Sequence, residues 1–153
     1  MTKSVILLSI FAVLQFGALG CASWGSGVRI ENLERPLNEI QKAASTSLPL
    51  GQRRVEKSGM EFFSRYFLTK GRKFLPAETA PVRYYAHVYI LGDRRPYVIE
   101  VFVKREKRVS PRGGEYVEDG TDQELATVVQ RRIQQQLSKR REQVNIIDDF
   151  RVF

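Results

Sequence analysis

The fold is decided by two strand-like segments, VRYYAHVYIL at residues 82–91 and YVIEVFVKR at residues 97–105, joined by GDRRP at residues 92–96. Both segments are rich in β-branched and aromatic residues, and they alternate with a period of two, which is typical of half-buried strands. The length and composition of the connection favour an antiparallel hairpin. Alternation predicts that one set of side chains points into the core: Val82, Tyr84, Ala86, Val88, Ile90, Tyr97, Ile99, Val101 and Val103.

Further elements are predicted on both sides of this hairpin. Upstream, apolar residues at helical spacing predict a helix over residues 33–47, with Pro36 near its start. The aromatic-rich segment 60–68 is interpreted as a strand. Downstream, Thr121-Asp122-Gln123-Glu124 has the form of a capping box, which predicts a helix from there to about residue 142. Residues 144–153 are expected to form a final strand or a segment packed on the domain.

The predicted order is therefore α-β-β-β-α plus a C-terminal tail. Such elements can bury their apolar faces when two helices cover one side of an antiparallel sheet. We predict an α+β fold, a two-layer sandwich in which a sheet of three to four strands carries two helices on one face. The length of 153 residues suits one domain.

Composition excludes several classes of protein. The formal net charge is +8, with 42% hydrophobic and 27% charged residues, which argues against a disordered chain or a polytopic membrane protein. A single Cys excludes a disulfide framework and a Cys-based zinc cluster, and a single His makes a multi-His metal site unlikely to form. We predict no metal site and no cofactor.

The N-terminus has the anatomy of an export signal. A short positive head at residues 1–3 precedes an apolar stretch from Val5 to Phe16 and a small-residue exit just before Cys21. The end of this segment, Ala18-Leu19-Gly20-Cys21, resembles the lipobox of bacterial lipoproteins. Two alternatives stay open: Val5 to Ala22 is nearly long enough for an uncleaved anchor, and Cys21 could be incidental to an ordinary signal peptide.

The lipoprotein resemblance implies a domain organisation and a location. Residues 1–20 would be removed, and Cys21 would be lipidated and joined by a flexible tether over 21–28 to a single periplasmic domain at 29–153. Ala22 follows the Cys, whereas retention in the inner membrane usually goes with Asp at that position. The resemblance therefore implies lipid anchoring on the periplasmic face of a Gram-negative outer membrane.

Positive charge is concentrated on the predicted strands and their loops. Residues 52–112 hold 15 basic and 6 acidic residues. Alternation leaves the sheet face away from the helices open and amphipathic, and this face is the candidate binding site. Its predicted members are Tyr85, His87, Tyr89 and Phe102, flanked by Arg83, Lys104, Arg94 and Arg95. Such a face suits an anionic, partly apolar partner; the alternative is a solvated face steadied by cross-strand Tyr pairs.

Enzyme motifs are missing from the sequence. It holds no phosphate-cradling Gly loop, no His-Glu metal pair and no Gly-x-Ser-x-Gly elbow, and His87 is interpreted as a strand residue rather than a catalyst. We therefore predict a non-enzymatic accessory or assembly subunit of a cell-envelope complex, with an envelope protein as partner. The alternative is a module that binds lipopolysaccharide or another anionic lipid. Export argues against a nucleic-acid partner.

Overall fold

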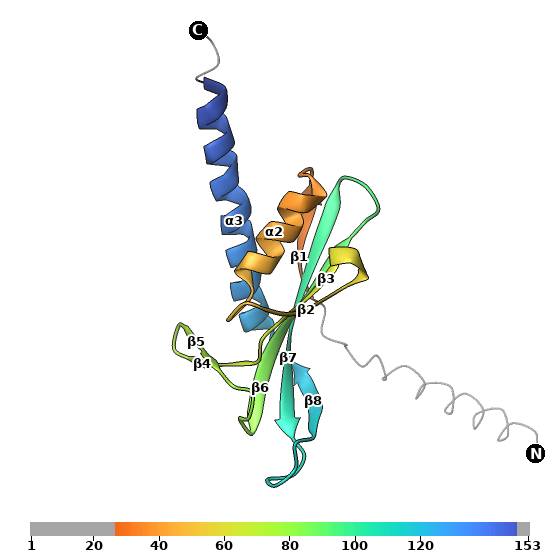
Figure 1. Cartoon of the computed structure of the whole chain (residues 1–153), viewed down its shortest axis with the longest axis vertical. Coiled ribbons are helices and arrows are strands. Elements are labelled where there is room, and N and C mark those ends of the chain that lie inside the picture. The colour runs from red at the N-terminus through yellow and green to blue at the C-terminus, as the bar shows by residue number, and fades with distance from the viewer. Residues whose placement is uncertain (1–26, 150–153) are drawn as a thin grey trace, which may run out of the picture.

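The computed structural model describes residues 27–149, with side chains described as far as residue 139. Eight strands and two α-helices follow one another, with one short 3₁₀ helix between β2 and β3 (Figure 1). The elements are β1 (Val28–Leu33), α2 (Leu37–Ser47), β2 (Gln52–Glu56), η1 (Lys57–Gly59), β3 (Glu61–Ser64), β4 (Phe67–Lys70), β5 (Lys73–Pro76), β6 (Val82–Leu91), β7 (Tyr97–Arg108), β8 (Tyr116–Thr121) and α3 (Gln123–Asp149).

The predicted hairpin is the centre of the sheet. β6 and β7 pair antiparallel over ten positions, from Val82 opposite Lys107 to Leu91 opposite Val98. The inward set of β7 is confirmed, because Tyr97, Ile99, Val101 and Val103 are all buried. On β6 the buried inward residues are Ala86, Val88 and Ile90, while Val82 and Tyr84 are only partly buried toward the end of the sheet.

The prediction of a three- to four-stranded sandwich is wrong, because the hairpin is flanked by six further strands in a single antiparallel sheet. β1 and β8 pair in succession with the outer edge of β7. β3 and β4 pair with β6, and they carry β2 and β5 on their outer sides. The fold is α+β overall, with an eight-stranded sheet and two helices.

The additional strands escaped prediction because they show little apolar alternation. All of β2 is exposed, β5 and β8 are almost entirely exposed, and such edge strands are held mainly by backbone hydrogen bonds to a neighbour. The predicted strand over 60–68 is two strands, β3 and β4. They separate at Arg65 and Tyr66, where the Arg65 N–H donates to the Gly51 carbonyl rather than to β6.

The first helix begins later than predicted. Leu33 ends β1, and Pro36 is the residue before the first turn, whose carbonyl accepts hydrogen bonds from the N–H groups of Glu39 and Ile40. A residue that precedes proline is pushed toward extended backbone, so the helix cannot start before this point. Val28, predicted as the end of the tether, and Leu33, predicted as the helix start, are the first and last residues of β1, which pairs with β7.

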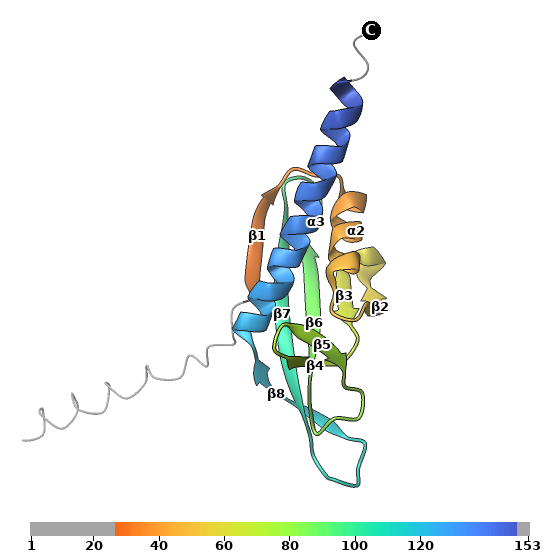
Figure 2. The ribbon, with the colours of Figure 1, turned by 90° about the vertical axis from the view of Figure 1, so that its left-hand side faces the viewer.

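Both helices cover the same face of the sheet (Figure 2). Ile40, Ala43 and Ala44 of α2 and Val129 and Ile133 of α3 pack with the inward residues of β6 and β7 in one core. The buried residues of this core that the structure describes lie between Ile30 and Leu137. No helix within residues 27–149 combines the length and apolar character needed to cross a bilayer.

The C-terminal prediction also needs correction. Residues 144–149 continue α3 instead of forming a strand, and residues 150–153 lie outside the described residues. α3 extends well past the end of the sheet (Figure 1).

The start of α3 is capped by Asp122, not by Thr121. Thr121 is the last residue of β8, whereas the Oδ1 atom of Asp122 accepts a hydrogen bond of 2.9 Å from the Leu125 N–H. The Asp122 carbonyl also accepts from the Ala126 N–H at 3.1 Å. Asp122 is therefore an N-cap on its own and not part of the predicted capping box, because Leu125, three residues later, has no side-chain acceptor.

A first prediction concerns the Asp122 N-cap of α3. Asp122→Ala is expected to lower the free energy of unfolding by about 1 kcal/mol, because an N–H of the first turn loses its acceptor. Urea denaturation followed by circular dichroism measures the loss. The matched control is Thr121→Ala, for which a change within about 0.5 kcal/mol is expected at this exposed position. A larger loss in the control than in Asp122→Ala would return the cap to Thr121.

Candidate functional site

The predicted residues of β6 and β7 lie on the sheet face opposite the helices, as alternation required. There they join side chains from β3, β8 and the β3–β4 connection in a continuous row of rings, which we call the aromatic ladder. It consists of Tyr116, Tyr66, Tyr85, Phe63, His87, Tyr89 and Phe102. Neighbouring ring centroids lie 3.9–6.5 Å apart from Tyr66 to Phe102, in stacked, tilted and edge-on arrangements.

Arg83 is built into the ladder rather than free to bind an anion. Its guanidinium lies between the rings of Tyr66 and Tyr116, 3.4 and 3.5 Å from their centroids. It also pairs with Glu106 at 2.7 Å and donates to the Glu78 carbonyl at 2.8 Å. With its side chain only 11% exposed, Arg83 is a structural cation that fixes the two tyrosine rings.

Lys104 is likewise matched by an acid of the same face. Its ammonium lies 2.9 and 3.0 Å from the two carboxylate oxygens of Glu118 on β8. Because β8 was not predicted, this partner could not be foreseen. Neither Arg83 nor Lys104 therefore offers an unmatched charge.

His87 is buried, which corrects the expectation that it would be open. It is 7% exposed, with its imidazole between the rings of Phe63 and Tyr89, at centroid distances of 4.0 and 3.9 Å. Its Nε2 atom lies 3.5 Å from Oε2 of Glu61 and makes no hydrogen bond to any described residue. Burial lowers the pKa of His87 to about 4, against the opposing effect of Glu61. A neutral, enclosed imidazole has no room for a substrate, so this geometry does not make it a general base.

Glu61 escaped prediction, and it is the buried acid of this face. Its carboxylate pairs with the Lys57 ammonium, and this hydrogen bond lowers the pKa of Glu61. Lys57 belongs to η1, where Lys57, Ser58 and Gly59 all have positive φ. The Gln41 side chain of α2 holds this turn by donating to the Gly59 carbonyl at 3.1 Å. The sequence alone gives no signal for this pair, because it depends on the β3–β6 register and on the turn.

The remaining predicted residues lie elsewhere. Arg94 and Arg95 are exposed at the tip of the β6–β7 hairpin, and Arg95 approaches only the Glu34 carbonyl, at 3.4 Å. The tip follows Leu91, two residues beyond Tyr89 of the ladder. Among the described residues, however, neither arginine forms an ion pair or stacks on a ladder ring. Cys21 lies outside the described residues.

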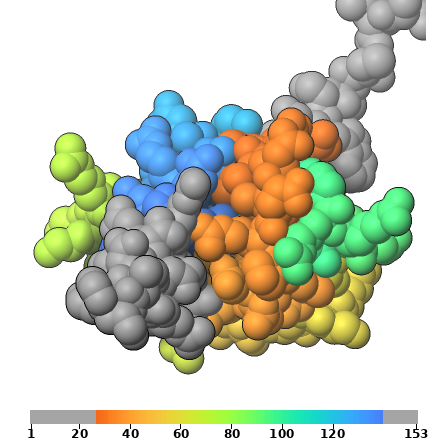
Figure 3. All heavy atoms as spheres, turned by 90° about the horizontal axis from the view of Figure 1, so that it is seen from above, coloured from red at the N-terminus to blue at the C-terminus, as the bar shows by residue number. Residues whose placement is uncertain are grey.

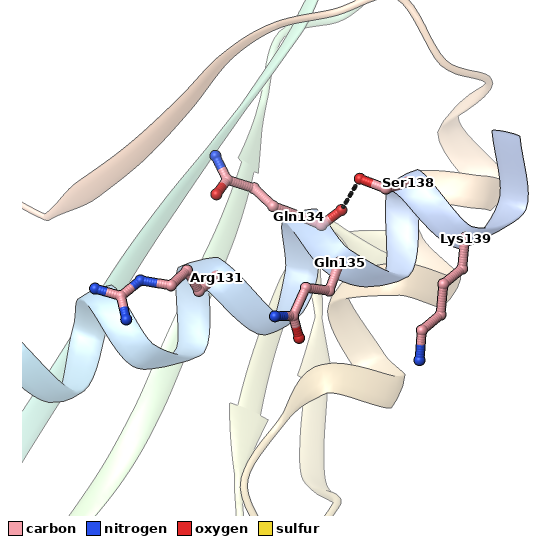
Figure 4. A pocket seen from close by; sticks show the side chains of 5 residues that line it. All are labelled: Arg131, Gln134, Gln135, Ser138 and Lys139. Atoms are coloured by element: carbon pink, nitrogen blue, oxygen red, sulfur yellow. Dashed lines mark hydrogen bonds between the residues drawn. The ribbon is translucent and has the colours of Figure 1, made fainter. Parts of the chain in front are cut away.

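A second surface was missed entirely by sequence reasoning. A hollow of about 450 Å³, which we call the α3 groove, separates the β4–β5 hairpin from α3. Arg72 and Phe74 line one side, and Leu125, Val128, Arg131 and Arg132 line the other. A further hollow of about 600 Å³ shares Arg131 and Gln135 with it and continues along α3 to Lys139 (Figure 4). The residues that line the α3 groove come from two segments far apart in the chain, β4–β5 and α3, so only the folded structure assembles the groove.

The α3 groove and the β6–β7 hairpin tip are separate sites. The space-filling view shows the β4–β5 hairpin (yellow-green) and the β6–β7 hairpin tip (green) on opposite sides of the molecule (Figure 3). A single ligand of ordinary size therefore cannot contact both.

The chain matches no protein-family model, no curated protein and no solved structure. Function therefore has to be inferred from the surfaces themselves. Within the described part of the chain, no group of three or more His, Cys, Asp or Glu side chains could hold a metal ion. Independence from metals and cofactors stays a prediction.

Proposed function

We propose that the protein is a non-enzymatic accessory or assembly subunit of a cell-envelope complex and binds a protein partner through the aromatic ladder. The observation that carries this proposal is that most of the cations on the ladder face are paired with carboxylates of the same face. Five ion pairs lie on it, and each joins a Lys or Arg to a Glu of the same face. They are Arg29–Glu100, Arg54–Glu56, Lys57–Glu61, Arg83–Glu106 and Lys104–Glu118.

Matched charge favours a protein partner over an anionic lipid on this face. A lipid headgroup gains little from cations that are already paired, whereas rings held in place lose little conformational freedom on binding. Tyr, Trp and Arg are also the residues that most often dominate the binding energy of protein interfaces. The face supplies partly exposed Tyr66, Tyr85, Tyr89 and Tyr116, with Arg53 stacked over the Tyr66 ring at 4.3 Å.

The proposal places the protein on the periplasmic face of the outer membrane, anchored through Cys21. The support is the lipobox-like sequence and its distance from the fold. β1 begins at Val28, seven residues after Cys21, so the tether can span at most about 25 Å. Such a short tether would hold the sheet close to the membrane and present the ladder to other proteins there.

A crosslinking pulldown from envelopes tests the proposal. The wild-type protein should recover a stoichiometric protein partner, and Arg53→Glu with Arg54→Glu should reduce the recovery at least tenfold. Both arginines are exposed and stack on ladder rings, at Tyr66 and Phe63, so reversing them changes the surface and spares the core.

The matched control reverses two exposed charges elsewhere, Lys42→Glu on α2 and Arg112→Glu in the β7–β8 connection. Normal recovery with this control and loss with the ladder variant support the proposal. Recovery of no stoichiometric protein, or equal loss in both variants, contradicts it. Mass spectrometry of the N-terminal peptide from the same envelopes tests anchoring separately, because an intact Met1 excludes it.

A further inference from the structure

The α3 groove concentrates positive charge that the structure leaves unmatched. No Asp or Glu lines it, and none of the ion pairs between described residues includes Arg72, Arg131 or Arg132. The ladder face differs, because five of its cations have carboxylate partners. Three guanidiniums around one hollow are suited to a phosphate or carboxylate, because each presents a planar fork of donors.

The groove also has an apolar wall. Phe74 of β5 lies under the Arg132 guanidinium, with 4.4 Å between the guanidinium carbon and the ring centroid. On α3, Leu125 is partly buried, and Val128 is 37% exposed. An inorganic anion would leave this wall in water, whereas a ligand with hydrocarbon next to its charge would cover it. A volume of about 450 Å³ is in the range of small-molecule sites.

We infer that the α3 groove binds a phosphorylated lipid, with Arg72, Arg131 and Arg132 on the phosphate and Phe74, Leu125 and Val128 against the adjoining hydrocarbon. The combination of unmatched cations and an apolar wall favours this class over an acidic peptide, whose charges are spread along a polar backbone. The phosphate chemistry would be shared by a free phosphate ester, so the wall is the feature that points to a lipid.

The place of the groove in the fold agrees with a ligand taken from the membrane. The Gln130 side chain, one residue before Arg131, donates to the Arg29 carbonyl at the start of β1. The helix that carries Arg131 and Arg132 therefore packs against β1, the strand that the tether enters. This step rests on the proposed anchoring at Cys21, while the charge and the wall do not.

The test measures binding of a short-chain phosphatidylglycerol, kept monomeric, to residues 22–153, which contain every described core residue and lack Cys21. Isothermal titration calorimetry should show saturable binding. Arg72→Gln, Arg131→Gln and Arg132→Gln together should weaken binding about 100-fold, because each basic residue is expected to raise the affinity about fivefold. Val128→Asp, at an exposed position, should weaken it at least tenfold while the domain stays folded.

The matched control removes three charges outside the groove, by Arg94→Gln, Arg95→Gln and Arg112→Gln, and should bind as the wild type does. Equal weakening in both triple variants would show general charge attraction and overturn the inference. Glycerol phosphate binding as tightly as the lipid would reduce the site to a phosphate site, and a glutamate-rich peptide binding more tightly would make it a protein-docking groove. Either result also overturns it. None of these measurements involves the ladder or the pulldown, so the two proposals can fail separately.

Discussion

Replacing Phe67 with alanine is expected to lower the free energy of unfolding by about 4 kcal/mol. Phe67 begins β4, and its side chain is fully buried. Its ring meets Phe74 edge-on at 4.8 Å and Tyr84 at 6.1 Å. The truncation removes apolar contacts with both rings and leaves a cavity that the sheet cannot close, because β6 is fixed between its neighbours. Urea denaturation monitored by circular dichroism measures the loss.

The same substitution should affect the α3 groove. β4 has a single registered pair with β6, Phe67 opposite Tyr84, so the Phe67 ring supplies much of what holds the β4–β5 hairpin in place. The hairpin carries Arg72 and Phe74, and its loosening should weaken lipid binding even where the domain remains folded.

The control is Leu75→Ala on the same hairpin. Leu75 is 41% exposed, and we expect a change of less than about 1 kcal/mol there. Similar losses at both positions would mean that Phe67 does not anchor the hairpin. Phe67→Leu, which keeps an apolar side chain of smaller size, should lie between the two.

Strands with buried side chains could be predicted from the sequence, whereas exposed strands could not. The β6–β7 hairpin could be predicted because its inward residues are buried, which imposes alternation on the sequence. β2, β5 and β8 could not, because most of their side chains are exposed and are under no such constraint. The start of α2 was misplaced because apolar periodicity runs through Leu33, while Pro36 sets the boundary locally.

The candidate site, too, could be predicted only in part. Alternation correctly brought Tyr85, His87, Tyr89 and Phe102 to one face. It could not show that Glu118 of β8 matches Lys104, or that Phe63 of β3 covers His87, because both partners come from strands whose pairing depends on tertiary structure. The face predicted to be basic and open is therefore partly covered, and five of its cations are paired with carboxylates. Three cations without a carboxylate partner among the described residues line the α3 groove, which no pattern within one segment could reveal.

A second large effect is expected on the free energy of unfolding when the pH is lowered. The unfolded chain should protonate His87 near its ordinary pKa of 6.5, while burial holds the pKa of the native imidazole at about 4. Between these values the unfolded state binds one more proton than the native state, so stability falls as the pH drops through this window. The pKa difference corresponds to about 3 kcal/mol lost by pH 4. Glu61 adds to the loss at still lower pH, because its native pKa is lowered as well.

The contribution of His87 to the pH dependence of stability can be measured without interference from other histidines. His87 is the only histidine, so no other imidazole contributes between pH 6.5 and 4. His87→Phe keeps a ring between Phe63 and Tyr89 and removes the titration, and it should flatten the dependence of unfolding free energy on pH above about 4.5. Urea denaturation of both proteins across this range measures the slopes. A slope that survives in His87→Phe, or a native imidazole that titrates near 6.5 by NMR, would show that His87 is accessible to water and that the ladder does not enclose it.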